Sequence, residues 1–117
     1  MTVRRLKTYA GSQGYVYQYY FVGKRPATAP PDSIEYVFDV TPDRTSTYAV
    51  SIFLAHSVVL AWDETHGRML SDSEQYAAVK LRLFRAFDEI ADMQSEGRQL
   101  YMDATFFEES LASLGVD

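Results

Sequence analysis

Cysteine is absent from the 117 residues of this chain, and histidine occurs only twice. Without cysteine there is no disulfide framework, no thiolate nucleophile and no cysteine-ligated zinc finger. The two histidines do not have the H-E-x-x-H spacing of a catalytic zinc site, and neither a G-x-x-x-x-G-K-[ST] phosphate loop nor a G-x-S-x-G nucleophile elbow is present. The sequence therefore predicts no metal and no cofactor, and no motif connects the chain to a known family.

Long apolar runs are absent too. A membrane-spanning helix needs roughly 20 apolar residues in succession, and the charged N-terminal stretch is not followed by the apolar core of a secretory signal. We therefore expect a cytoplasmic protein with no membrane partner. An apolar share of 47% with 23% charged residues is ordinary for a soluble protein. The length predicts one domain, residues 1–117, with its own core.

Negative charge is concentrated in the second half of the chain. Residues 1–60 hold six Lys and Arg against four Asp and Glu, a balance of +2, whereas residues 61–117 hold five against twelve, a balance of −7. The two sum to the net charge of −5. We attribute the asymmetry mainly to helices that gather acidic residues for solubility.

One stretch, residues 71–94, has the pattern of a long amphipathic helix. On a helical wheel its apolar residues fall on one arc and its charged residues on the other. Ser71 and Glu74 have the spacing of a capping box, which marks the start of the helix. A helix with such an apolar face must cover something flat and apolar, which predicts a sheet beneath it.

Four stretches have strand character: residues 3–9, 14–23, 34–41 and 47–54. The last two are joined by a short link, which predicts an antiparallel pair. Alternation places one side of each of the last two strands under the helix: Ile34, Tyr36, Phe38 and Val40 of the third strand, and Tyr48, Val50, Ile52 and Leu54 of the fourth. We predict an α+β fold of two layers, in which C-terminal helices pack on one face of a four-stranded, mainly antiparallel meander.

The remaining segments are assigned from turn and capping signals. Residues 24–33 hold three of the four prolines and predict an irregular loop. Residues 56–66 predict a short helix closed by Gly67, with an extension of the fourth strand as the alternative. Residues 105–114 predict a last helix, with capping spacing in Thr105 and Glu108 and an end at Gly115.

The second strand is apolar on both sides, which is unusual for a sheet with one open face. Tyr15, Tyr17, Tyr19 and Phe21 share one side of it. Either both sides are covered or the sheet presents an aromatic back face to a partner. We favour the second interpretation. It predicts a homodimerisation or protein-interaction module that uses these four residues and, from the neighbouring loop, Lys24 and Arg25.

An aromatic strand close to basic residues is also a pattern that stacks nucleic-acid bases. The basic residues are Arg4, Arg5, Lys7, Lys24 and Arg25. However, the chain is acidic overall, whereas nucleic-acid-binding domains usually carry a basic surface. Nucleic acid is therefore not an expected partner.

The alternative function is acid–base catalysis on a small substrate. His56, Asp63, Glu64 and His66 gather titratable groups in one short segment, and Asp63 could orient His66 across one helical turn. His66 could equally be a helix cap, because it directly precedes Gly67.

Lys80 is the remaining candidate, since it falls inside the apolar arc of the long helix. Its amine must either extend to water, or be paired with a carboxylate, or have a depressed pKa.

Overall fold

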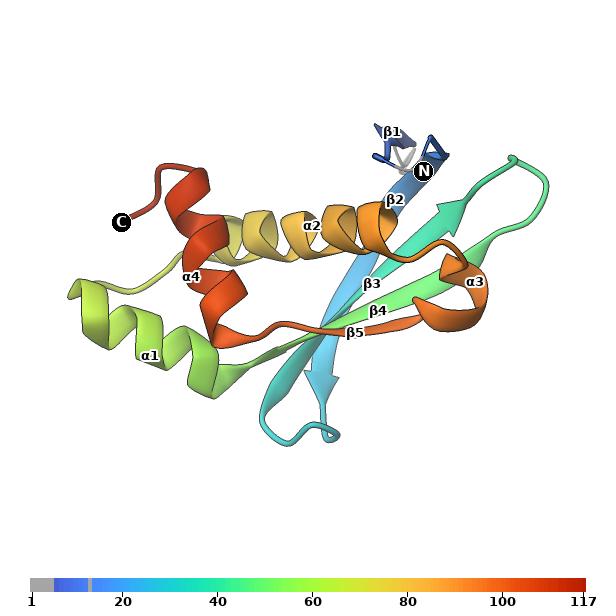
Figure 1. Cartoon of the computed structure of the whole chain (residues 1–117). Coiled ribbons are helices and arrows are strands. Elements are labelled where there is room, and N and C mark those ends of the chain that lie inside the picture. The colour runs from blue at the N-terminus through green and yellow to red at the C-terminus, as the bar shows by residue number, and fades with distance from the viewer. Residues whose placement is uncertain (1–5, 13) are drawn as a thin grey trace.

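The structure, a computed structural model, describes residues 6–12 and 14–117. The elements follow in the order β1 (Lys7–Ala10), β2 (Val16–Ala27), β3 (Ser33–Thr41), β4 (Tyr48–Ala55), α1 (His56–His66), α2 (Asp72–Glu89), α3 (Met93–Glu96), β5 (Gln99–Tyr101) and α4 (Ala104–Ser113). The strands form a twisted sheet, and α2 lies across it (Figure 1). Within the described residues, no helix has the length and apolar character needed to cross a bilayer.

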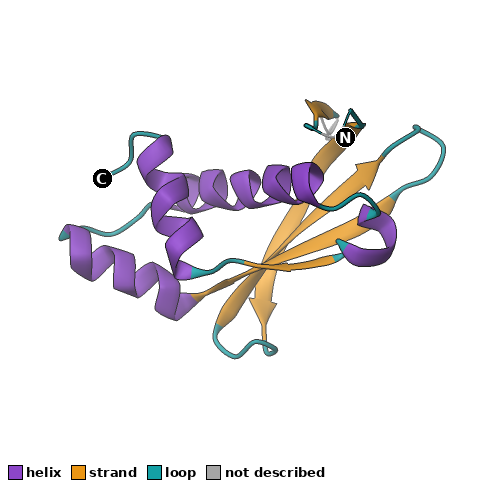
Figure 2. Ribbon diagram, viewed as in Figure 1, coloured by secondary structure: helices purple, strands orange, loops and turns teal. Residues whose placement is uncertain are grey.

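The sheet has five strands in the order β1-β2-β3-β4-β5 (Figure 2). The first four are antiparallel to their neighbours in sequence, so the predicted α+β fold with a mainly antiparallel meander is confirmed. The fifth strand was not predicted. It pairs parallel with β4 and has only three residues, too few to show alternation. Residues 3–5 of the predicted first strand lie outside the described residues.

The long helix α2 begins where the capping box predicts. The Ser71 hydroxyl accepts from the Glu74 backbone amide (3.2 Å), and the Glu74 carboxylate accepts from the Ser71 amide (2.9 Å). The helix ends earlier than predicted, at Glu89, because Ile90 has an extended backbone. The predicted last turn instead contains a separate short helix, α3, whose cap is Asp92.

The core lies between α2 and the predicted faces of β3 and β4. Phe38, Val50 and Ile52 are fully buried, and so are Val79 and Leu83 of α2. The predicted buried faces of β3 and β4 are therefore confirmed. Leu100 of β5 and Phe107 and Leu111 of α4 complete the same core.

The face assignment of β2 was wrong. Tyr19 pairs with Val40 and Phe21 with Phe38, so the odd-numbered residues of β2 before the bulge share the face that α2 covers. Tyr17 and Tyr19 are consequently buried, with exposed fractions of 4% and 3%. The Tyr17 ring stacks on Phe87 of α2 with a centroid separation of 4.2 Å. These tyrosines are core residues because the core extends one strand further than the sequence pattern indicated.

Strand β2 also continues into the stretch predicted to be a loop. A bulge at Val22 shifts the register, so that Phe21 pairs with Phe38 and Gly23 with Val37. Because of this extra residue, Lys24 and Arg25 exchange the faces that simple alternation would give them. Pro26 is tolerated because β1 pairs with only the first part of β2, and the outer edge beside Pro26 has no neighbouring strand among the described residues.

Both outer helices were predicted. Helix α1 follows β4 without a loop and ends at Gly67, which adopts the left-handed conformation with φ of 69°. This confirms the helix over the strand extension. In α4 the observed cap is Asp103 rather than Thr105: its carboxylate accepts from the Phe106 amide at 2.7 Å.

Candidate functional site

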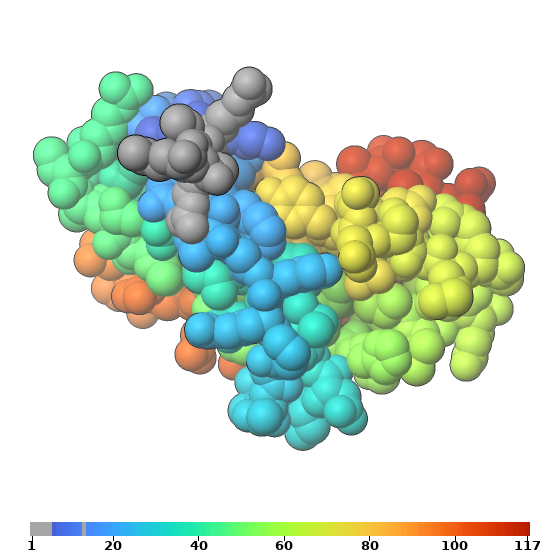
Figure 3. Space-filling model, turned by 180° about the vertical axis from the view of Figure 1, so that it is seen from behind, coloured from blue at the N-terminus to red at the C-terminus, as the bar shows by residue number. Residues whose placement is uncertain are grey.

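The helices leave one surface of the sheet uncovered. We call this surface the open face. By register it is formed by Gln18, Tyr20, Gly23 and Arg25 of β2, Glu35, Val37 and Asp39 of β3, Ala49, Ser51 and Phe53 of β4, and Gln99 and Tyr101 of β5. Most of these residues are half-buried by their neighbours in the sheet. In the space-filling view from behind, the light-blue atoms of β2 lie at the surface with no helix over them (Figure 3).

The charged groups at the centre of the open face are paired with one another. Glu35 accepts from Arg25 Nε (2.8 Å) and from the Ser51 hydroxyl (2.5 Å). Both hydrogen bonds lower the pKa of Glu35 below its usual value, and the one from Arg25 has the larger effect. Asp39 accepts from the Tyr20 hydroxyl at 2.7 Å. Both carboxylates therefore have partners within the sheet itself.

Apolar side chains lie around this polar centre. Val22, in the bulge, is 37% exposed, and Tyr101 at the β5 edge is 52% exposed. The Tyr101 ring stacks on Phe53 of β4, with centroids 5.3 Å apart. A hollow of about 220 Å³ opens beside the bulge, where Val22 and Val37 form its apolar part. The face thus combines exposed apolar groups with a shallow depression.

The residues predicted to form an interface are divided between core and surface. Tyr17 and Tyr19 are buried and Phe21 is half-buried, whereas Tyr15 is 54% exposed at the start of the strand. Arg25 belongs to the open face. Lys24 lies on the helix side, with its amine 3.6 Å from Asp72 and 5.8 Å from the centre of the Tyr36 ring.

Sequence reasoning did not select Val22, Phe53 or Tyr101 as interface residues. The alternation of β3 and β4 does place Phe53 on the outer side, which was the available signal. Alternation also puts Val22 on the side of Gln18 and Tyr20, which was not the side selected, and Tyr101 lies on a strand too short to detect.

The predicted acid–base residues do not converge. His56 is the first residue of α1 and His66 the last, so about 15 Å of helix separates them. Asp63 does not orient His66; its carboxylate accepts from the Leu70 amide at 3.1 Å and supports the turn after α1. His56 and Glu64 are exposed.

His66 has a structural environment at the end of α1. Its ring stacks on Trp62 with centroids 4.1 Å apart, and Nε2 lies 2.5 Å from a Glu108 carboxylate oxygen. The Arg68 side chain lies over the Trp62 ring, with its guanidinium carbon 5.1 Å from the ring centroid. These contacts join α1, the following loop and α4, whereas the C-cap of α1 itself is Gly67, whose amide donates to the Asp63 carbonyl oxygen.

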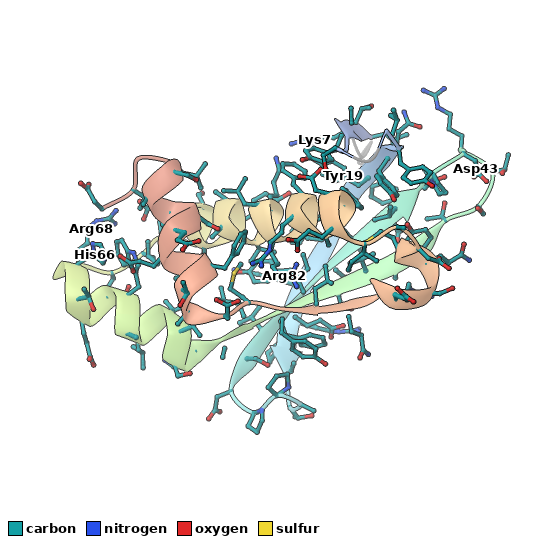
Figure 4. The ribbon with its side chains drawn as sticks, in the orientation of Figure 1. Lys7, Tyr19, Asp43, His66, Arg68 and Arg82 are labelled. Atoms are coloured by element: carbon teal, nitrogen blue, oxygen red, sulfur yellow. The ribbon has the colours of Figure 1, made fainter. Side chains whose placement is uncertain are left out.

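Lys80 lies at the edge of the core. Its amine is 5.9 Å from the Tyr76 centroid and 5.8 Å from the Phe84 centroid. Burial lowers the pKa of Lys80, and the neighbouring Lys7 lowers it further. No ion pair to a carboxylate is present for it among the described residues. Lys7 and His66 lie far apart in the molecule, so Lys80 does not join the α1 residues in one site (Figure 4).

No group of three or more potential metal ligands occurs within residues 6–12 and 14–117. Comparison of the chain with protein-family models, curated proteins and solved structures finds no match. Among the described residues, the open face is a partly apolar surface of the sheet, with Val22 and Tyr101 exposed at its margins.

Proposed function

We propose that this chain is a self-association module: two copies pack together through the open face. The observation that carries the proposal is the uncovered sheet surface whose carboxylates already have partners. A large sheet face that is partly apolar is a common site of protein interaction.

The internal pairing removes the main energetic obstacle to covering the face. Burying a carboxylate without a partner costs several kcal/mol. Glu35 is held by Arg25 and Ser51, and Asp39 by Tyr20, before any partner arrives. A partner that covers these groups therefore need not supply new hydrogen bonds to them.

The edges of the sheet favour contact through the face rather than added strands. β5 has three residues and β1 has four. The part of β2 whose outer edge has no neighbouring strand among the described residues carries Lys24, Arg25 and Pro26. Short edge strands, charged residues and proline all discourage strand addition.

A second copy is the partner that fits best. The helical half of the chain carries the net charge of −7, so two copies that met through their helices would repel. On the open face, by contrast, the carboxylates of Glu35 and Asp39 already have hydrogen-bond partners within the sheet. Two-fold association would place this surface against itself.

Sedimentation equilibrium of the whole chain tests the proposal. We expect a dimer that dissociates on dilution. Val22→Glu should shift the mass to that of a monomer at the same concentration, because it adds a charge to an exposed apolar position. Met69→Glu is the matched control: Met69 is 82% exposed on the loop before α2, and its variant should stay dimeric. A monomeric wild type, or a Val22→Glu variant as dimeric as the wild type, would refute the proposal.

A further inference from the structure

A pocket lies at one end of the sheet, beside α3. Its volume is about 380 Å³, within the range of sites for small ligands. Its walls come from four parts of the chain: the start of β2, the residue after β3, the start of β4, and the link between α2 and α3. The side chains that matter are Tyr15, Tyr17, Pro42, Tyr48, Asp92 and Met93.

Two of the tyrosines are buried except where they meet the pocket. Tyr17 is 4% exposed and Tyr48 is 6% exposed. Neither hydroxyl forms a hydrogen bond within the described residues, although buried hydroxyls are normally paired. The only buried side-chain nitrogen and oxygen atoms without a partner in that part of the chain are Trp62 Nε1 and Ser110 Oγ. The two phenol oxygens are therefore accessible to solvent, and both tyrosines line the pocket.

Both phenols remain neutral at ordinary pH. Burial raises the pKa of Tyr48 to about 12; the neighbouring Tyr17 phenol and Asp92 carboxylate act in the same direction, and Arg98 opposes them. Burial also raises the pKa of Tyr17, with Tyr15 and Asp92 contributing. The Phe87 ring, stacked at 4.2 Å, holds Tyr17 in place.

Among the described residues that line the pocket, Asp92 is the one charged group and none is lysine or arginine. Asp92 caps α3 through one oxygen, which accepts from the Ser95 amide at 3.1 Å. Its second oxygen is not used by the cap. Arg98 lies beside the Tyr48 ring, with its guanidinium carbon 5.9 Å from the ring centroid, and it donates to the Ala49 carbonyl oxygen.

We propose that this pocket binds the primary ammonium group of a small amine with an apolar body. An ammonium group has three N–H donors, and the free oxygens of Asp92, Tyr17 and Tyr48 are three acceptors. Tyr15, 54% exposed at the mouth, adds an aromatic face that attracts cations. Pro42 and Met93 provide apolar contact for the body of the ligand.

A quaternary ammonium ion would fit less well, since it has no N–H and would leave the two phenols unpaired. The site shares no residue with the open face, so the proposal is independent of self-association.

Titration calorimetry with three compounds of similar shape tests the chemistry. We expect phenethylamine to bind and its neutral isostere, 2-phenylethanol, and an anion, 3-phenylpropionate, to bind at least tenfold more weakly. Loss of a hydrogen bond to a charged group corresponds to about a ten- to hundredfold change in affinity. No binding of phenethylamine, or equal binding of 2-phenylethanol, would overturn the proposal.

Variants locate the site. Asp92→Asn should weaken phenethylamine binding about ten- to hundredfold while the fold is retained, because asparagine also caps helices. Tyr48→Phe removes only the hydroxyl and should weaken binding as well. Glu96→Gln is the matched control, since it removes one negative charge from α3 without touching the pocket wall, and it should bind like the wild type. Wild-type affinity in both Asp92→Asn and Tyr48→Phe would show that the amine binds elsewhere and would refute the assignment.

Discussion

Tyrosine at a strand position has two common roles, interface and core, and the residue alone does not distinguish them. Tyr15 and Tyr17 are two positions apart and point to the same side of the chain. Tyr15 lies ahead of the strand and is 54% exposed, whereas Tyr17 packs against Phe87 and is 4% exposed. The position of α2 over the strand causes the difference, and this position is a tertiary property.

The matched substitutions Tyr15→Glu and Tyr17→Glu separate the two roles. Tyr17→Glu should reduce the free energy of unfolding by several kcal/mol, because it buries a carboxylate against an aromatic ring. Tyr15→Glu should change it by no more than about 0.5 kcal/mol, as is usual at exposed sites. Urea denaturation followed by circular dichroism measures both. Equal effects of the two substitutions would mean that Tyr17 does not lie in the core.

At the level of elements, the sequence predicts what periodicity and capping control. The start of α2, the C-terminal glycine of α1 and the buried faces of β3 and β4 were all predicted from local patterns. The β2 bulge, β5 and the end of α2 were missed. The bulge depends on pairing with β3, and β5 exists only because the chain after α3 returns beside β4. Contacts between distant segments, which no local pattern encodes, determine these features.

The same limit applies to the candidate site. Phe53 could be placed on the outer side of the sheet from the alternation of β4. Arg25 and its pairing with Glu35 could not, because only the bulge brings these two residues to the same side. The α1 histidines were close in sequence, but the helix holds them at opposite ends.

The N-terminus of α2 should make the stability of the protein sensitive to acid. Arg68 binds Glu74 through two hydrogen bonds, of 3.0 and 2.9 Å, and with the capping box this lowers the pKa of Glu74 from 4.5 to about 2. A lowered carboxyl pKa stabilises the fold above the unfolded value. This contribution is therefore complete above pH 4.5 and is lost as the pH falls towards about 2.

Thermal denaturation across this pH interval checks the effect. Glu74→Gln should flatten the decline of the melting temperature on acidification, since glutamine can still cap the helix but does not titrate. Arg68→Gln should flatten it too, because it removes the main cause of the lowered pKa. If both variants declined as steeply as the wild type, Glu74 would not be part of the acid response.

On the scale of the whole molecule, most acidic residues lie in the helical layer, and the proposed contact surface lies on the opposite side of the sheet. The helices carry most of the acidic residues and the core occupies the space beneath them. The other side of the sheet is partly apolar and its carboxylates are paired internally. Self-association therefore requires that a second copy covers the open face in solution.

The distance between spin labels in two copies tests this most directly, and the absence of cysteine makes a single introduced thiol unique. Nitroxide labels would be placed at Val22→Cys on the open face and, as a control, at Met69→Cys. Face-to-face sheets lie about 10 Å apart, so dipolar spectroscopy should detect a short distance between copies for labels at Val22 and none that short at Met69. Absence of dipolar coupling at Val22, or a shorter distance at Met69, would contradict self-association through this surface.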